Sequence, residues 1–258
     1  MKLKFSNTEP TSWRDLQDQV ARFLNQADYY AKSPCTINTA RGTVEVDVLV
    51  ESPDELVKKI VCECKFWDTP VPKEKIHAFR TVVSDSGASL GLLISKSGFQ
   101  SGAIEAAKYS NIQLMTWDEF LTMIQNKWIL CRLKRLKEIS APLSVYTNYL
   151  DFPYEKLLPE DKARYNSAVN EYISLRSTCW MISKTDLLNE INEHVRWYRM
   201  EEFSSVEDYL NFLFDETERA ISFYEEIVRH SGIEIDSSKF ENLEGYLYMF
   251  LNSGASHN

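Results

Sequence analysis

The sequence predicts an α/β domain with a mixed β-sheet flanked by helices, followed by a mainly α-helical C-terminal domain. Up to about residue 125, segments with the two-residue period of strands alternate with segments that have the 3.6-residue period of helices. Beyond that point no strand period returns. A hairpin of strands followed by strand–helix–strand crossovers is typical of a mixed sheet with helices on its faces.

The first elements are a helix and two strands. In residues 11–30, TSWRDLQDQVARFLNQADYY, apolar residues recur three or four positions apart, and Thr11 or Ser12 is expected to cap the helix. Residues 43–50 change to a period of two, with four valines at alternate positions. The residues ESPDE then predict a turn, and residues 60–66 form the second strand.

Both strands carry charged residues among apolar ones. In the first strand Asp47 is expected to project from the face opposite to the four valines. In the second, Glu63 and Lys65 share one face with Val61, while two cysteines lie on the other. If the charged faces align, two carboxylates and an ammonium group meet at one sheet surface. Such a pair of carboxylates requires a compensating cation, and Mg²⁺ prefers oxygen ligands.

Five further elements complete this domain. A helix begins after DTPVP and ends at SDSG, and the nearly continuous apolar run ASLGLLIS is typical of a strand covered on both faces. GFQSGAIEAAKYS predicts a helix, IQLM a short strand, and TWDEFLTMIQ another helix. We therefore expect one domain over residues 1–125 and a second over residues 126–258.

Composition and charge restrict the class of protein. No apolar run approaches the roughly 18 residues that cross a membrane, and the polar N-terminus does not resemble a signal peptide. Five cysteines without CxxC pairs argue against a disulfide framework, so we expect a cytoplasmic protein. Residues 1–140 carry 19 Lys and Arg against 17 Asp and Glu, whereas the remainder carry 10 against 21. The two parts are thus expected to have different partners.

The pattern D-x15-E-x-K of Asp47, Glu63 and Lys65 resembles that of the PD-(D/E)xK nuclease superfamily. More narrowly, residues 13–120 resemble the Mrr-type restriction endonuclease domain of bacterial restriction and anti-phage defence proteins. The leading helix, VEVDVLV, CECKFWDTPV and the long segment LGLLISKSGFQSGAIEAAKYSNIQLM all contribute to the resemblance. The E-x-K pair alone would have almost no specificity.

The resemblance implies a set of functional residues and a cofactor. Asp47 and Glu63 would be ligands of Mg²⁺, for which Mn²⁺ could substitute, and the backbone carbonyl of Cys64 would be a further ligand. Lys65 would be the catalytic lysine. Many family members carry a glutamate on the first helix, where this chain has Gln17. A neutral amide could hold a water molecule but would weaken a second metal site.

The function implied is a metal-dependent endodeoxyribonuclease that hydrolyses phosphodiester bonds of DNA in restriction or anti-phage defence. A repair nuclease or an RNA nuclease would use the same chemistry. A different class of protein, a catalytically inactive nucleic-acid-binding or assembly subunit with a nuclease fold, also fits, and Gln17 favours it. The acidic residues 126–258 are expected to regulate the enzyme, to form a homo-oligomer, or to bind a protein partner.

Overall fold

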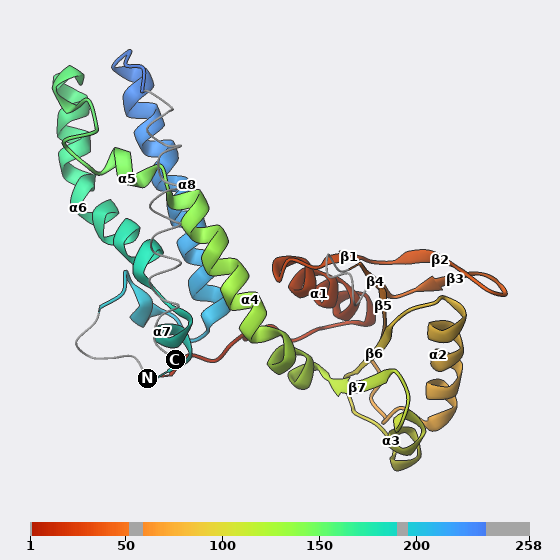
Figure 1. Cartoon of the computed structure of the whole chain (residues 1–258). Coiled ribbons are helices and arrows are strands. Elements are labelled where there is room, and N and C mark those ends of the chain that lie inside the picture. Colours follow the sequence, from red (N-terminus) through yellow and green to blue (C-terminus); the bar gives the residue numbers. More distant parts are fainter. Residues whose placement is uncertain (1, 52–58, 190–195, 236–258) are drawn as a thin grey trace, which may run out of the picture. The chain divides into compact units, whose positions relative to one another are not determined.

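The computed structural model describes residues 2–51, 59–189 and 196–235 (Figure 1). The chain divides into two compact units. We call residues 8–132 the N-terminal unit, and residues 1–7 together with residues 133–258 the C-terminal unit. Helix α4 (Trp117–Ser140) begins in the first and ends in the second. Within the described ranges, no helix combines the length and the apolar character that crossing a membrane requires.

The N-terminal unit contains a mixed sheet flanked by helices, as the sequence predicts, and the sheet has five strands in the order β1-β4-β5-β6-β7. β1 and β4 pair antiparallel, as do β4 and β5, whereas β5, β6 and β7 pair parallel. The elements are α1 (Trp13–Gln26), β1 (Tyr30–Lys32), β2 (Cys35–Thr39), β3 (Gly42–Val46), β4 (Val48–Glu51), β5 (Lys59–Lys65), α2 (Lys73–Asp85), β6 (Leu90–Ser95), α3 (Ser101–Ala107) and β7 (Ile112–Thr116).

Helix α1 covers one side of the sheet, where it packs against β1, β4 and β5. Ser12 caps it, because the Ser12 hydroxyl accepts a hydrogen bond of 3.1 Å from the backbone N–H of Asp15. This arrangement satisfies one of the amide groups that the first turn of a helix leaves without a partner. The apolar face that the sequence predicts is buried and consists of Leu16, Val20, Phe23 and Leu24.

Helices α2 and α3 cover the other side, and Figure 1 shows α1 and α2 on different sides of the central strands. Phe79 and Val83 of α2 form one apolar cluster with Val61 of β5 and Leu93 of β6. The helix approaches the sheet so closely that a Cβ on Gly91 would lie 2.6–2.9 Å from neighbouring side-chain carbons. A larger residue at position 91 would therefore push α2 off the sheet.

The strand expected over residues 43–50 is wrong in one respect. The chain bends at Asp47, and β3 pairs with β2 in a separate two-stranded sheet, whereas β4 belongs to the main sheet. The four valines therefore do not share one face. Val46 packs into the cluster under α2, whereas Val50 pairs with neighbouring strands of the main sheet. The turn expected at ESPDE lies outside the described residues, apart from its first residue.

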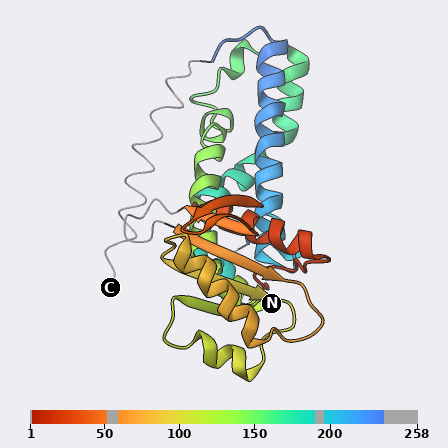
Figure 2. The same ribbon diagram turned by 90° about the vertical axis from the view of Figure 1, so that its right-hand side faces the viewer.

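The described residues of the C-terminal unit are mainly helical, and α6 and α8 pack side by side within it (Figures 1 and 2). Its core is rich in aromatic rings, and the Phe152 and Tyr165 rings stack with their centres 4.8 Å apart. Residues 2–7 join this unit through a strand-like bridge between Lys4 and Ser205. Its further elements are α5 (Leu143–Tyr146), η1 (Tyr154–Lys156), α6 (Pro159–Met181), α7 (Lys184–Leu188), η2 (Met200–Glu202) and α8 (Val206–His230).

A buried carboxylate joins the start of α6 to the end of α8. Asp161 is fully buried, and its carboxylate accepts hydrogen bonds from the Ser231 hydroxyl at 2.6 Å and the Arg164 guanidinium at 3.3 Å. The ring Nδ1 of His230 lies 2.7 Å from the same carboxylate. Burial alone would raise the pKa of Asp161, but these three partners outweigh it and hold the pKa below its ordinary value.

Candidate active site

The bend between β3 and β4 places the Asp47 carboxylate beside β5. One carboxylate oxygen accepts a hydrogen bond of 2.6 Å from the backbone N–H of Cys64, and the other accepts one of 2.5 Å from the side-chain amide of Gln17. Three segments that are far apart in the sequence therefore meet at this carboxylate. Both donors are neutral amide groups, so they orient Asp47 without cancelling its charge.

The other two charged residues, Glu63 and Lys65, lie on the same face of strand β5 as Val61. The Lys65 ammonium forms an ion pair with the Glu63 carboxylate, and the two side chains are 17% and 27% exposed, respectively. Because Val48 pairs with Cys62 across the antiparallel strands, the register brings Asp47 next to Glu63. The structure thus brings together the three residues that the sequence pattern selects.

The electrostatics of Asp47 differ from those of an ordinary surface carboxylate. Burial and the negative charge of Glu63 together raise the pKa of Asp47 to about 6. The backbone N–H of Cys64, the Lys65 ammonium and the Gln17 amide act in the opposite direction, but they do not compensate. Two carboxylates therefore share one ammonium group, and the site would gain free energy from an additional cation.

Gln17 lies in the site, at the position on α1 where the family resemblance places it. Only 1% of the residue is exposed, and its amide oxygen accepts a weak hydrogen bond of 3.4 Å from Arg14. A glutamate here would stand within hydrogen-bond distance of the Asp47 carboxylate and would repel it. The amide avoids that repulsion and instead donates to Asp47. The strand pattern alone gives no signal for this contact.

The cysteines on the opposite face of β5 are core residues. Both thiols are fully buried, and burial raises the pKa of Cys62 to about 12 and that of Cys64 well above its ordinary value. Such thiols remain protonated and are poor nucleophiles and poor metal ligands. The contribution of Cys64 to the site comes from its backbone, whose N–H already orients Asp47.

The residues present fit a hard divalent cation. Among the residues that the structure describes, no group of three or more His, Cys, Asp or Glu side chains is arranged to hold a metal. The available donors are the carboxylates of Asp47 and Glu63 and the backbone carbonyl of Cys64. All are oxygen atoms, which is the donor set that Mg²⁺ and Mn²⁺ accept. The raised pKa of Asp47 is the electrostatic sign that a cation would be favourable here.

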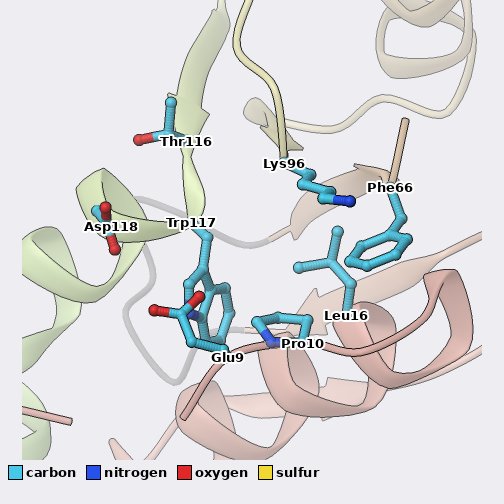
Figure 3. A pocket seen from close by; sticks show the side chains of 8 residues that line it. All are labelled: Glu9, Pro10, Leu16, Phe66, Lys96, Thr116, Trp117 and Asp118. Atoms are coloured by element: carbon cyan, nitrogen blue, oxygen red, sulfur yellow. The ribbon is translucent and has the colours of Figure 1, made fainter. Parts of the chain in front are cut away.

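A pocket of about 140 Å³ opens at the carboxyl ends of β5, β6 and β7 (Figure 3). Figure 3 shows the Lys96 ammonium beside the Phe66 ring, and the distance from Nζ to the ring centre is 4.5 Å. The same ammonium pairs with Asp68 at 2.7 Å. The carboxylates of Glu9 and Asp118 also line the pocket, so it is not suited to a phosphate group.

Comparison with known proteins supports the assignment of this unit. Residues 8–124 match the family model Mrr_cat, described as restriction endonuclease, and this range contains all the candidate site residues. No curated protein matches the chain. A crystal structure of a protein of unknown function, AF1548, matches at 17% identity and a TM-score of 0.38, covering 64% of this chain and 99% of that one. A likeness at that level carries no argument about function.

Proposed function

We propose that residues 8–124, which form an Mrr-type restriction endonuclease domain, hydrolyse phosphodiester bonds of DNA with the help of a divalent metal ion. The observation that carries the proposal is the pair of carboxylates, Asp47 and Glu63, that share the single ammonium group of Lys65. A partly buried Asp47 beside Glu63 lowers stability, which is unexpected for a residue that serves only the fold. The same pair is a favourable site for Mg²⁺ or Mn²⁺.

Each residue has a separate role in this proposal. Asp47 and Glu63 would hold the ion, together with the backbone carbonyl of Cys64. A bound divalent ion would polarise the phosphate and lower the pKa of water. Lys65 would release its ion pair with Glu63 and stabilise the negative charge that develops on the phosphate oxygens. Gln17 would keep the Asp47 carboxylate oriented through its amide.

Cleavage of supercoiled plasmid in Mg²⁺ or Mn²⁺ tests the proposal. We expect Lys65→Ala and Glu63→Ala to lower the rate by about 100-fold or more, the range typical for the loss of one stabilising group. Lys108→Ala and Glu105→Ala are matched controls, because these residues form an exposed ion pair at the end of α3. If the wild-type protein binds DNA but leaves it intact, the proposal that it is an enzyme is wrong. If it cleaves RNA and not DNA, the proposal that it is a deoxyribonuclease is wrong.

Gln17 favours a second candidate, a nucleic-acid-binding or assembly subunit that does not cleave. A neutral residue at this position removes one possible ligand, and a site that needs two metal ions would then be incomplete. Gln17→Glu distinguishes the two candidates. If the wild type is inactive and Gln17→Glu cleaves DNA, the natural protein is the non-cleaving subunit. Cleavage by the wild type excludes that function.

For residues 126–258 we propose a role in control rather than chemistry. The acidic balance of this region disfavours direct DNA contact, so a second copy of the chain or a protein partner is the better candidate. Light scattering of the full chain coupled to size exclusion would detect a homo-oligomer. The proposed setting is restriction or anti-phage defence in the cytoplasm. The five free thiols fit a reducing compartment.

A further inference from the structure

A tryptophan lies exposed at the edge of the candidate active site. Trp67 follows β5 two positions after Lys65, and 36% of its surface is exposed. The Lys65 ammonium lies 5.6 Å from the centre of the Trp67 ring, and the Lys75 ammonium of α2 lies 5.8 Å from it. The ring therefore lies within about 6 Å of two cationic groups, one of which is the residue proposed to stabilise the reacting phosphate.

The backbone that carries Trp67 is held firmly. Hydrogen bonds and an ion pair join the loop after β5 to the loop after β6, so the backbone at Trp67 is fixed in position. The ties are the Ser97 hydroxyl to the Trp67 carbonyl at 2.6 Å, the Val71 N–H to the Gly98 carbonyl at 2.9 Å, the Gln100 N–H to the Val71 carbonyl at 3.0 Å, and the Lys96–Asp68 ion pair at 2.7 Å.

The main core does not include this ring. The apolar cluster under α2 contains Val71 of the loop and Ile76 of α2, but Trp67 is not part of it. Two ammonium groups over one exposed ring stabilise it by only about 0.5–1 kcal/mol each. What the arrangement offers is an exposed aromatic ring whose two neighbouring ammonium groups lie on flexible side chains and can move to a phosphate when a base stacks on the ring. Ammonium groups bind phosphates, and aromatic faces stack on bases in a manner that tolerates any sequence.

We propose that Trp67 and Lys75 bind the substrate strand next to the scissile phosphate, with Trp67 stacked on an unpaired base and Lys75 on a flanking phosphate. The proposal rests on the proposed nuclease function and adds a substrate class, DNA with unpaired bases beside the cut. Nucleotides on one strand rise by about 3.4 Å each. A ring 5.6 Å from the Lys65 ammonium thus lies within about two nucleotides of the reacting phosphate.

The preference for unpaired bases follows from the geometry of duplex DNA. In a duplex each base face is covered by its neighbours, and unstacking a step costs a few kcal/mol. A rigid ring at the site edge gains its full stacking energy only where that cost is already met, as at a bubble, a flap or a frayed end. Trp67 should therefore discriminate between paired and unpaired DNA, whereas Lys75 should bind both.

Binding to two oligonucleotides of the same sequence, one fully paired and one with a short central bubble, tests the inference. Fluorescence anisotropy is measured with full-length protein carrying Asp47→Asn, so that the DNA is not cleaved. We expect tighter binding to the bubble, and Trp67→Ala to weaken bubble binding about tenfold, the range for loss of one stacked base. Trp67→Phe should retain most of the affinity. Trp13→Ala, which removes another exposed tryptophan, on α1, should change neither affinity.

The outcomes separate this inference from the proposed function. Equal binding of the two oligonucleotides by the parent protein would overturn the inference, and so would an equal loss on both in Trp67→Ala. A selective loss on the bubble supports it, even if the wild type never cleaves DNA and the proposed function fails. Conversely, the inference fails and the function stands if the wild type cleaves both DNAs and Trp67→Ala cleaves and binds them as the wild type does.

Discussion

Two carboxylates, the partly buried Asp47 in the N-terminal unit and the fully buried Asp161 in the C-terminal unit, have opposite electrostatics. Asp161 in the C-terminal unit accepts from a hydroxyl and a guanidinium group and contacts an imidazole, and its pKa lies below the ordinary value. Asp47 in the N-terminal unit accepts from two amides beside a second carboxylate, and its pKa rises to about 6. The partners of Asp161 stabilise its ionised form, whereas ionisation of Asp47 lowers the stability of the folded N-terminal unit.

The difference distinguishes a structural carboxylate from a candidate functional one. A buried charge whose partners compensate it holds elements together, here the start of α6 and the end of α8. A partly buried charge that its partners do not fully compensate is characteristic of a site that binds a cation or a substrate. The same Asp→Asn substitution should therefore have opposite consequences in the two units.

The largest expected difference concerns cleavage. Asp47→Asn should lower the rate of plasmid cleavage in Mg²⁺ by about 100-fold or more, because a neutral amide is a poor ligand for a hard cation. Asp161→Asn should leave the rate at the wild-type value at a temperature where the unit stays folded. A wild-type rate in Asp47→Asn would exclude this residue as a ligand. A matching loss in Asp161→Asn would show that the C-terminal unit takes part in the reaction.

Stability should change in opposite directions. Asp161→Asn should destabilise the C-terminal unit by about 1–3 kcal/mol, because a buried acceptor with three polar partners loses its charge. Asp47→Asn should stabilise the N-terminal unit at pH 7.5 by about 1–2 kcal/mol. This value is smaller than the pKa shift alone would give, since water screens a partly exposed group.

Hydrogen exchange of the full chain, followed by mass spectrometry, measures each unit separately. Exchange should become faster in α6 and α8 for Asp161→Asn and slower in β4 and β5 for Asp47→Asn. Gln17 can rotate its amide and accept from the side-chain amide introduced at position 47, so the hydrogen bond is kept. Faster exchange in β4 and β5 would contradict the view that the Asp47 charge opposes folding.

The pH dependence of metal binding is the next smaller effect. A folded-state pKa raised from 3.8 to about 6 means that Asp47 contributes stability below pH 3.8 and loses that contribution as the pH rises to about 6. Mg²⁺ must displace the proton. The affinity of the protein for Mg²⁺ should thus fall about tenfold for each pH unit below pH 6 and stay constant above pH 7. Calorimetric titration between pH 5 and 8 measures this, and an affinity level down to pH 5 would contradict it.

The smallest effect should come from His230 at the end of α8. The Asp161 carboxylate raises the pKa of His230, with a contribution from Glu160 and an opposing one from Arg164. The charged imidazole therefore adds stability below pH 6.5, and this is lost as the pH rises through its raised value. In the wild type, exchange at the end of α8 should be slightly slower at pH 6 than at pH 8, after correction for the intrinsic pH dependence of exchange. His230→Gln should abolish the difference between the exchange rates at pH 6 and pH 8. If the difference is unchanged in this variant, a group other than His230 causes it.

The sequence is sufficient to place the central strand but not the bend beside it. Alternation along β5 correctly assigns Glu63 and Lys65 to the face that Val61 shares. The same rule fails at Asp47, because an unbroken period of two does not reveal that the chain changes sheets there. Strands β1 and β2 are both missed, and Tyr30, which the sequence assigns to the leading helix, begins β1. The sequence of β2, CTINT, has one large apolar residue, Ile37, and its partner strand supplies the remaining information.

Contacts between distant residues account for the rest of what the sequence does not predict. The hydrogen bond from the Cys64 N–H to Asp47 depends on strand register, which no local pattern specifies. Asp161 and His230 are 69 residues apart, and neither has a spacing that suggests the other. Gln17 could be assigned only by family resemblance, since an amide on a helix face is ordinarily a solvated residue.

The bend at Asp47 also divides the domain into a frame and an arm. Strands β1 and β4 are antiparallel neighbours, so the β2–β3 hairpin is an excursion that leaves the frame after one and returns at the start of the other. Asp47 stands at the point of return. Substitutions on the exposed surface of the arm would thus change the surface that a substrate meets near the site, while the Asp47 carboxylate keeps its position. One extra residue between Val46 and Val48 would turn the Asp47 carboxylate away from Glu63. Diversification is therefore expected at the exposed positions of the arm, such as Thr36 and Asn38, because Ile37 and Val46 pack into the cluster under α2.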